Sequence, residues 1–469
     1  MKKMYSVFSI LFCYSCLEAQ YVQLFDFANP SDGNLPSGDL FYDGSQLYGM
    51  TCCGGANFLG DIFKINTDGT GFVKLFDFDG SISGSLPKGS LISDGLFLYG
   101  MTSTGGSSDL GVIFKIKSDG TGFTKLLDFD GLNYGSNPKG SLIYDGTFLY
   151  GVTQGGGFCG GGVVFKVMTD GSGFSDISCG FYYDGANPTG SLILDGAFLY
   201  GMSEHGGGIN DYGNIFKLKI DGTTGSTILD FDDNFNGKYP RGSLIYDGVF
   251  LYGMAYEGGA NNEGTLIKIK PDGTGYSKLL DFDGIFGNGS YPCGSLISDG
   301  NFLYGMNWGG GSGLCGTGCG TIFRIRFDGT SYSKLLDFGV GNNSAKPQSS
   351  LIIVGNCLFG MTTEGGNAGS GTIFKFCNFN SVNPSIKINN YKLTLSPNPA
   401  TTVFTIENSK FKTGETDEVE IRNVLGQLCQ SSIVNGQSSS VSISTLPAGI
   451  YFVQLKTKVG IASGKLVKQ

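Results

Sequence analysis

Histidine is nearly absent from this chain: the 469 residues contain only one, His205, and a single tryptophan, Trp308. A multi-histidine metal site therefore cannot form, and Ser-His-Asp or Cys-His catalysis would depend on His205 alone. Charged residues make up only 15% of the chain. After the N-terminus, no stretch reaches the roughly 18 apolar residues of a membrane span. These shortages weigh against metal-dependent and histidine-dependent enzymes and against a helical membrane protein.

The first nineteen residues contain two lysines, then an apolar stretch, then a small residue before Gln20. This order is typical of a secretory signal peptide, so residues 1–19 are predicted to be removed by cleavage after Ala19. A lipid anchor on Cys16 is the alternative, but the preceding Cys13-Tyr14-Ser15 fits that signal poorly.

Glycine, by contrast, is abundant, with 80 residues, and much of it falls in a repeat of about fifty residues. Each copy has four short apolar runs separated by turn signals, such as GSLI, FLYGM, GVIFKI and KLLDF within 87–129. The aromatic residue of the second run recurs seven times, at Tyr48, Tyr99, Tyr150, Tyr200, Tyr252, Tyr304 and Phe359. A period of this length made of short strands predicts an all-β fold, a seven-bladed β-propeller.

Within a copy, we name the four predicted strands a, b, c and d. Asp94-Gly95 between strands a and b predicts a tight hairpin in which both turn residues have positive φ. Both faces of LYGM and IFKI are apolar, which favours blades stacked on both sides over a two-sheet sandwich. A lone d-type strand at 21–27 precedes the first copy, and the last copy lacks a d strand. We therefore expect this strand to complete the last blade and close a ring over 20–377.

The composition changes after the repeats. Residues 378–390 are predicted to be a linker, and from Tyr391 glycine becomes rarer while Ser, Thr and Val increase. Three motifs follow in order: YKLTLSPNPATTVFTI, EVEIRNVLGQLC and LPAGIYFVQLKTKVGIASGKLVKQ. Together they resemble the type IX secretion (Por) sorting domain over 391–469, with one departure at Asn423, where the motif often has Asp.

That resemblance implies a small Ig-like β-sandwich that carries its cargo through the outer membrane and is usually cleaved off afterwards. It implies the type IX secretion translocon and sorting machinery as partners. It also implies a final location in the medium or on the bacterial surface, where many such cargoes are anchored to lipopolysaccharide.

The repeats themselves resemble the GloVer tandem-repeat family of secreted proteins, through the patterns DGxxLYGMTxxGG, GxIFKI and DGTGF. This resemblance covers nearly all of 21–377 and implies a kelch-like propeller. It implies a fold and no particular reaction.

Charge is divided unevenly along the chain. The net charge of the chain is −9, whereas the predicted leader carries +1, the linker +1 and 391–469 +3, which leaves −14 on the propeller. A domain this acidic repels polyphosphate, so we expect no nucleic-acid partner. We also expect a monomer.

Ten cysteines remain after removal of the leader, and export permits disulfides. In a meander, the start of strand b lies beside the end of c, and the start of c lies beside the end of d. This topology predicts the pairs Cys357–Cys377 and Cys159–Cys179.

Cys315 and Cys319 share one loop and could pair with each other or with Cys293. A zinc site at these two residues would need two more ligands, and a disulfide is the commoner use in an exported chain. The neighbouring Cys52 and Cys53 are too close for an easy bridge.

The long loops are the candidate functional surface. The a–b and c–d turns are short and lie on one face of the ring, whereas the variable b–c and d–a loops share the other. The seven b–c loops are 51–60, 102–111, 153–162, 203–213, 255–264, 307–320 and 362–371. Their paired glycines recur in every copy and no Lys follows them as in a phosphate-binding loop, so we interpret them as structural.

Four residues on this surface are candidates for catalysis. Glu204, Glu257 and Glu364 occupy equivalent b–c positions, and two facing carboxylates would suffice for glycoside hydrolysis. His205 could act as a proton shuttle. The alternative is that all four are ordinary solvated loop residues.

Three further residues are candidates for ligand binding. Trp308 and Tyr256 lie in equivalent loops of neighbouring copies, and exposed aromatic rings beside Asn307 could stack on sugar rings. The alternative is that Trp308 packs into its own loop.

A calcium loop is a second metal-binding pattern in the repeats. Asp232, Asn234 and Asn236 fit its front half, but Ser243 stands where the closing Glu belongs. We therefore predict no cofactor, with Ca²⁺ at these residues as the alternative.

Three hypotheses for function remain. The leading one is a non-enzymatic exported propeller that binds polysaccharide or protein through its long-loop face. The second is a polysaccharide-active hydrolase or lyase, against which the single histidine and the lack of a nucleophile motif weigh. The third is a structural or adhesive surface protein.

Overall fold

The computed structural model describes residues 20–28, 30–158, 160–178, 186–284, 287–311, 315, 318–340, 344–377, 379, 391–392, 394–397, 400–407, 416–423, 428–435, 438–457 and 460–468. The chain forms two compact units, 1–379 and 380–469, each of which is treated by itself below. The predicted signal peptide, the predicted Cys159–Cys179 pair and all of the predicted linker except Phe379 lie outside the described residues.

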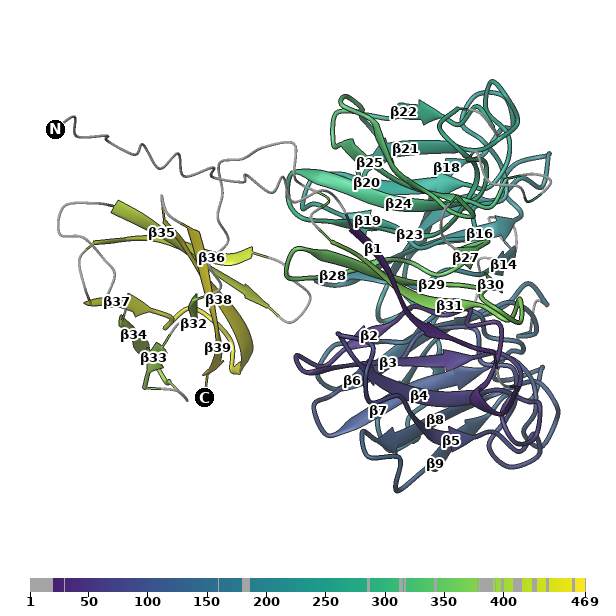
Figure 1. The fold of residues 1–469 in the computed structure, drawn as a ribbon, viewed down its shortest axis with the longest axis horizontal. Helices are drawn as coiled ribbons and strands as arrows, with labels where there is room; N and C mark the ends of the chain where they lie inside the picture. Colours follow the sequence, from purple (N-terminus) through teal and green to yellow (C-terminus); the bar gives the residue numbers. More distant parts are fainter. Residues whose placement is uncertain are drawn as a thin grey trace, which may run out of the picture. The chain divides into compact units, whose positions relative to one another are not determined.

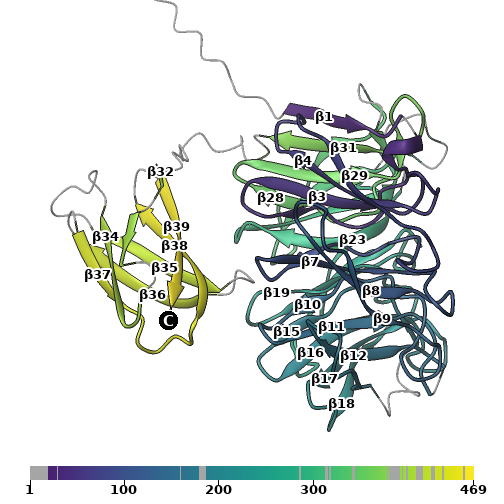
Figure 2. The same ribbon diagram turned by 90° about the horizontal axis from the view of Figure 1, so that it is seen from below.

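The described part of the first unit contains seven successive antiparallel sheets of four or five strands, seen from the edge of the ring in Figures 1 and 2. The first three sheets are β2 (Phe41–Tyr42), β3 (Gln46–Thr51), β4 (Asp61–Asn66) and β5 (Val73–Asp77); β6 (Ile92–Ser93), β7 (Phe97–Thr102), β8 (Val112–Lys117) and β9 (Thr124–Asp128); and β10 (Ile143–Tyr144), β11 (Phe148–Thr153), β12 (Val163–Met168) and β13 (Ser175–Asp176).

The next three sheets continue the same meander. They are β14 (Ala186–Pro188), β15 (Ile193–Asp195), β16 (Phe198–His205), β17 (Asn214–Lys219) and β18 (Gly225–Asp230); β19 (Ile245–Tyr246), β20 (Leu251–Ala255), β21 (Thr265–Ile269) and β22 (Ser277–Asp281); and β23 (Ser290–Ser298), β24 (Phe302–Gly309), β25 (Thr321–Arg326) and β26 (Ser333–Asp337).

The seventh sheet joins the two ends of the repeat region. Its order is β1 (Gln20–Asp26), β31 (Thr372–Cys377), β29 (Cys357–Thr362) and β28 (Ile352–Val354). β1 pairs antiparallel with β31 from Gln20↔Cys377 to Asp26↔Thr372, so the N-terminal strand is the fourth strand of this sheet. The predicted Cys357–Cys377 disulfide is confirmed and links β29 to β31 beside β1.

The aspartate of the Asp-Gly turn forms hydrogen bonds both to the turn backbone and to the tyrosine of the LYGM run. In the second sheet, Asp94 Oδ1 accepts the N–H groups of Leu96 and Phe97, each at 2.8 Å. Its Oδ2 accepts the buried hydroxyl of Tyr99 at 2.7 Å. The turn differs from the predicted one: three residues separate β6 and β7, and of Asp94 and Gly95 only Gly95 has positive φ, at 93°. The carboxylate caps the turn, which removes the need for a second positive φ.

The cores lie between successive sheets. One cluster combines Tyr48 and Ile62 of the first sheet with Leu98 and Phe114 of the second. Another combines Phe63 of the first sheet with residues of the seventh, including Phe359 and Ile373, so the series closes on itself. This packing explains why both faces of the strands are apolar. The predicted all-β propeller fold is confirmed.

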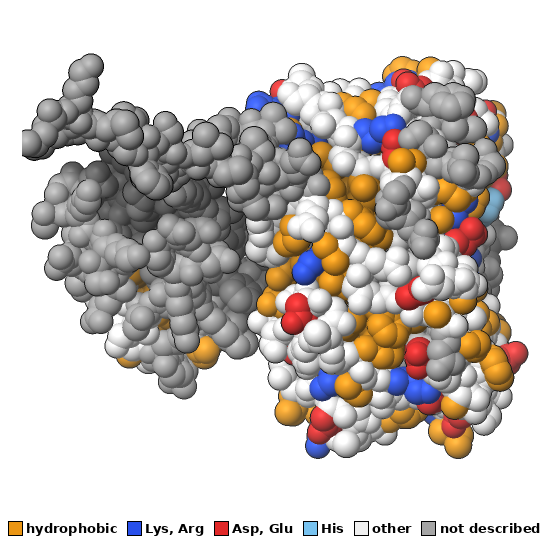
Figure 3. Space-filling model, in the orientation of Figure 1, with side chains coloured by type: hydrophobic (Ala, Val, Ile, Leu, Met, Phe, Trp, Pro, Cys, Tyr) orange, Lys and Arg blue, Asp and Glu red, His pale blue; other side chains and the backbone are white. Residues whose placement is uncertain are grey.

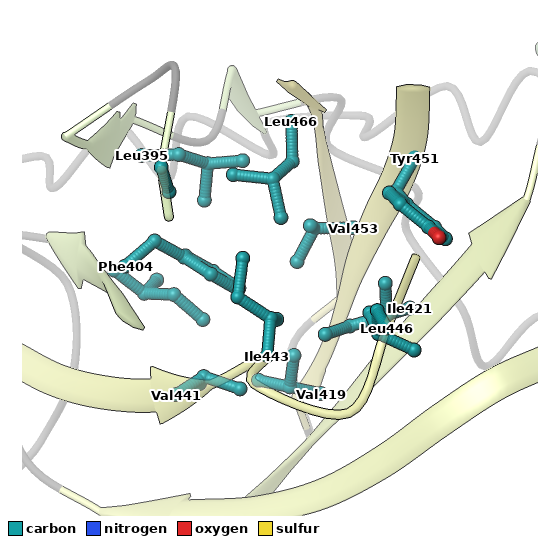
Figure 4. Close-up of a cluster of buried hydrophobic side chains, with 12 residues drawn as sticks. Leu395, Phe404, Val419, Ile421, Val441, Ile443, Leu446, Tyr451, Val453 and Leu466 are labelled. Atoms are coloured by element: carbon teal, nitrogen blue, oxygen red, sulfur yellow. The ribbon is translucent and has the colours of Figure 1, made fainter. Parts of the chain in front are cut away.

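The second unit is a pair of facing sheets. One contains β32 (Tyr391–Lys392), β35 (Thr416–Asn423), β36 (Leu428–Asn435), β38 (Gly449–Thr457) and β39 (Gly460–Lys468); the other contains β33 (Thr394–Ser396), β34 (Val403–Glu407) and β37 (Ser438–Ser442). Side chains from both meet in one core, in which Phe404 and Val441 approach Val419 and Val453 (Figure 4). This arrangement agrees with the predicted β-sandwich.

Helical structure is minimal. The helical residues in the described ranges are those of the 3₁₀ turn η1 (Pro30–Asp32). Within these ranges there is accordingly no helix long and apolar enough to cross a membrane.

Candidate ligand-binding site

The propeller axis is surrounded by a closed ring of hydrogen bonds. Each sheet begins with a short segment, Gly-Ser-Leu in most copies, and the backbone N–H of one copy donates to the side chain of the next. The donors and acceptors are Asp39 to Ser90, Ser90 to Ser141, Ser141 to Ser191, Ser191 to Ser243, Ser243 to Ser295 and Ser295 to Ser350, at 2.7–2.9 Å. The N–H of Ser350 donates to Oδ1 of Asp39 at 2.5 Å and closes the ring.

Glycine permits this close approach. A Cβ at Gly89 would lie 2.3 Å from the carbonyl oxygen of Gly140, so any other residue would force the segments apart. Asp39 replaces serine in the first sheet. Burial raises the pKa of this carboxyl, although hydrogen bonds from Ser350 and Ser90 oppose that shift.

A cavity of about 310 Å³ lies on the axis beside this ring. The residue before each glycine contributes to its wall, including Lys88, Lys139 and Arg241. Two aromatic residues join them, Tyr256 and the β24 residue Trp308. Because strand a runs from this segment to the Asp-Gly turn, the cavity belongs to the face opposite those turns. This is the long-loop face, where β14, β27 (Ser344–Ala345) and β30 (Glu364–Gly365) lie at the right of Figure 1.

Basic side chains set the electrostatics of the cavity. Burial, followed by the charge of Lys88, lowers the pKa of the Lys139 ammonium; Arg241 adds to this shift and Glu204 opposes it. Arg241 behaves differently: burial alone would lower its pKa, but the Glu204 carboxylate raises it. Nε of Arg241 donates to Oε1 of Glu204 at 2.8 Å.

The two aromatic residues each carry a cation on one ring face. The guanidinium carbon of Arg241 lies 3.7 Å from the ring centre of Tyr256. The Lys346 ammonium lies 3.6 Å from the ring of Trp308. Tyr291 bridges the two rings, with centroid distances of 5.2 Å to Tyr256 and 6.2 Å to Trp308. Burial raises the pKa of Tyr256 to about 12, so its hydroxyl stays protonated at neutral pH.

Asn307, the third predicted binding residue, lies inside the sheet instead. Its side chain is fully buried, and Nδ2 donates to Oγ1 of Thr321 at 2.9 Å and to the carbonyl of Asn288 at 3.1 Å. Asn307 and Trp308 are successive residues of β24, so their side chains point to opposite faces of the sheet.

The predicted catalytic carboxylates have different surroundings. Glu204 is held by Arg241, Glu364 is exposed, and Glu257 is half-buried beside Lys238, with which it exchanges backbone hydrogen bonds. Nδ1 of His205 lies 3.2 Å from a carboxylate oxygen of the exposed Asp211, and its ring contacts Tyr239. These four residues are not part of the cavity wall.

The predicted calcium loop uses its oxygens internally. Oδ1 of Asp232 accepts the N–H groups of Phe235 and Asn236, and Oδ1 of Asn236 accepts the N–H of Asp232 at 2.7 Å. Asn234 is exposed. Over the described part of the chain, no three His, Cys, Asp or Glu side chains are grouped so that they could hold a metal.

The cysteines of the long loops fall into two groups. Cys315 and Cys319 form a disulfide, which was one of the predicted pairings. Cys293 remains a free, buried thiol in the cavity wall, and burial raises its pKa to about 12. Cys52 and Cys53 are also free, with their sulfur atoms 2.9 Å apart.

Sequence reasoning missed the basic residues of the cavity. A signal was present: when the copies are aligned on Gly-Ser-Leu, the preceding position varies between Lys88, Lys139, Arg241 and neutral residues while its neighbours repeat. Variation at one position of an otherwise regular axial segment marks a place where packing does not dictate the residue.

Two known sequence patterns match the chain. The Gloeobacter/Verrucomicrobia repeat matches residues 8–147, 93–249 and 133–319. The chain belongs to this repeat family. The secretion system C-terminal sorting domain matches residues 394–469. The protein is therefore a type IX secreted protein, located at the cell surface or outside the cell, whose tail interacts with the type IX secretion machinery. No protein of curated function matches the sequence.

Solved structures with a similar fold are distant in sequence. A fungal alcohol oxidase of the AA5 family, solved with copper, has a TM-score of 0.51 at 11% identity, covering 96% of this chain and 98% of that one. PorZ, a surface component of the type IX secretion system of Porphyromonas gingivalis, has a TM-score of 0.47 at 13% identity, covering 93% of this chain. This chain spans 60% of the PorZ chain. A GH74 xyloglucanase from Xanthomonas campestris has a TM-score of 0.46 at 12% identity, covering 83% and 59% of the two chains. Similarity this low concerns the fold alone.

Proposed function

We propose that this protein is an exported propeller that binds a polysaccharide in its axial cavity without cleaving it. The observation that carries the proposal is the convergence of Tyr256 and Trp308, from different sheets, on one cavity wall. Aromatic rings with polar neighbours stack on the apolar faces of sugar rings while the neighbours bond to hydroxyl groups. Export places the cavity where polysaccharides are found.

The dimensions and chemistry of the cavity support this function. Its volume lies at the small end of the range for ligand pockets, which suits the end or a side branch of a chain. Arg241 and Lys346 each cover one face of an aromatic ring, which orders the rings before a ligand arrives.

Hydrolysis or elimination is the competing function. Retaining glycosidases place two carboxyl groups about 5–5.5 Å apart, and inverting ones about 6.5–9.5 Å apart. Arg241 forms an ion pair with Glu204, and none of Glu204, Glu257 and Glu364 lines the cavity. This arrangement favours binding over catalysis.

The test is a glycan array probed with the exported protein, with new reducing or unsaturated ends measured on the same polysaccharides. We expect binding without product formation. Trp308→Ala should weaken binding by about tenfold, since stacked aromatic contacts contribute on the order of 1 kcal/mol or more. Leu96→Ala, at an exposed position on the Asp-Gly turn face, should leave affinity unchanged. Product formation would support an enzyme in place of a binding protein. An array without any bound glycan would contradict the proposal.

A further inference from the structure

The axial cavity is locally basic in an acidic domain. The propeller carries a net charge of −14, yet three of the side chains that line the cavity are Lys88, Lys139 and Arg241. On the side of the propeller visible in Figure 3, acidic and basic side chains are interspersed. The grouping at the axis is therefore a departure from the general pattern.

The two lysines of the cavity differ in their pairing from the lysines of the fourth strands. Several lysines on the fourth strands bond to the Asp three residues later: Lys74 to Asp77, Lys125 to Asp128, Lys278 to Asp281 and Lys334 to Asp337, at 2.7–3.0 Å. Among the described residues, Lys88 and Lys139 form no ion pair. No carboxylate of the described ranges lies within ion-pair distance of either ammonium group, although the charge of Glu204 acts on Lys139 at longer range.

This crowding of like charges makes the protonated form of Lys139 less stable. The lowered pKa of Lys139 reflects burial and the neighbouring charges of Lys88 and Arg241. Two like charges in a partly desolvated site repel each other, and a bound anion would relieve that repulsion. The free protein therefore holds an electrostatic preference for an anionic ligand.

Arg241 is positioned to contribute direct hydrogen bonds. Its guanidinium lies on the ring of Tyr256, and its Nε is bonded to Glu204. Neither terminal nitrogen has a hydrogen-bond partner in the described residues, so both are available to a ligand oxygen. A planar guanidinium held by stacking loses little further freedom when it binds a carboxylate or sulfate.

Two carboxyl groups oppose this positive charge. Glu204 neutralises part of the charge of Arg241. Asp39 lines the cavity, but its Oδ1 accepts the N–H of Ser350 and burial raises its pKa, both of which reduce its influence on a ligand. Lys88 and Lys139 remain as cavity cations without an ion pair among the described residues.

We infer that the cavity takes an anionic substituent of the polysaccharide, a uronate carboxylate or a sulfate ester, with Lys88, Lys139 and Arg241 as its contacts. This inference rests on the proposed function and specifies its ligand class. The aromatic residues Tyr256 and Trp308 then hold the sugar ring that bears the charge.

The test compares acidic polymers with neutral counterparts of the same backbone. Binding of the exported protein is measured to polygalacturonate and its fully methyl-esterified form, and to dextran sulfate and unmodified dextran, at physiological salt. We expect binding to one or both acidic polymers and at least tenfold weaker binding to their neutral partners. The two pairs distinguish a carboxylate from a sulfate ligand.

The matched variants carry the same loss of charge. K88Q/K139Q removes two cavity cations and should weaken acidic binding by about tenfold or more. K117Q/K270Q removes two cations at the c–d turns on the opposite face and should change affinity less than twofold. Thermal unfolding of both variants checks that the fold is intact.

The remaining outcomes separate the two claims. Neutral polymers that bind as well as acidic ones, with no effect of K88Q/K139Q, would overturn the anionic inference and leave polysaccharide binding standing. If K88Q/K139Q and K117Q/K270Q lost the same amount of affinity, binding would depend on the overall charge and not on the cavity, and the inference would be overturned. If none of these polymers binds and a broad glycan array is also silent, the proposed function itself fails.

Discussion

Asp61 has a buried carboxyl group, and only one of its two oxygens has a hydrogen-bond partner. Oδ1 accepts the hydroxyl of Thr51 at 2.8 Å, whereas Oδ2 is buried without a hydrogen-bond partner. Burial raises the pKa of Asp61 from its ordinary value of 3.8 to about 8, and the neighbouring Asp77 adds to this shift. The folded state therefore binds this proton more tightly than the unfolded chain does, and stability falls as the pH rises from about 4 to about 8.

Asp61→Asn should remove this pH dependence. Asn214 occupies the same position at the start of β17, so the fold accommodates the amide. We expect the variant to melt about 2–5 °C above the parent at pH 8 and close to it at pH 4, by differential scanning calorimetry. Asp61→Thr, which copies Thr265 at the start of β21, should behave alike. If the melting temperatures of variant and parent differed by the same amount at pH 4 and at pH 8, the pKa of Asp61 would not be raised.

At the scale of residues, the sequence predicted which face a residue belongs to better than whether its side chain is buried. Trp308 and Tyr256 could be assigned to one face because their loops are equivalent in the repeat. The grouping of Asn307 with them is wrong, because its repeat position is that of Thr51 and Thr102, which end strand b and are fully buried. The role of Lys88 and Lys139 emerges only when separate copies meet around the axis.

At the scale of elements, the last sheet is the one assembled from both ends of the repeat region. β1 supplies its outer strand, and the Cys357–Cys377 disulfide ties β29 to β31 beside it. Both the pairing and the disulfide could be predicted, because strand count and meander topology determine them. The short strands β14, β27 and β30 could not, because they arise where long loops of a blade pair with each other.

Removal of the Cys357–Cys377 bridge should destabilise the propeller. The bridge spans 20 residues, and loop-closure entropy then predicts a loss of about 3 kcal/mol in the variant with both cysteines changed to serine. The measurement is the free energy of unfolding in guanidinium chloride. The Cys315–Cys319 bridge spans only 4 residues, so its double serine variant is a control with a smaller expected loss. Equal losses for the two would show that loop length is not the determining factor.

At the scale of the whole molecule, the acidic propeller and the basic C-terminal unit are separate compact units. The C-terminal unit has its own core, built from residues such as Phe404, Ile421 and Val453. It matches a sorting domain, whereas the cavity belongs to the propeller alone. Export and ligand binding should therefore be separable by mutation.

Deletion of residues 391–469 should prevent export in a host with type IX secretion. We expect the truncated chain to accumulate in the periplasm, and the parent chain to reach the surface or medium without this segment, by mass spectrometry of cell fractions. Trp308→Ala is the control, since it alters the cavity and should be exported normally. A surface product that retains an intact 391–469 would contradict cleavage of the tail.

The location of the ligand is the central claim, and hydrogen–deuterium exchange of the exported protein with and without a bound polysaccharide tests it most directly. We predict slower exchange with ligand in peptides that contain 88–90, 139–141, 241–243, 255–264 and 307–311. Peptides that contain the Asp-Gly turns, such as 94–96, should be unaffected. Protection confined to those turns or to 391–469, with none around the axis, would contradict binding in the axial cavity.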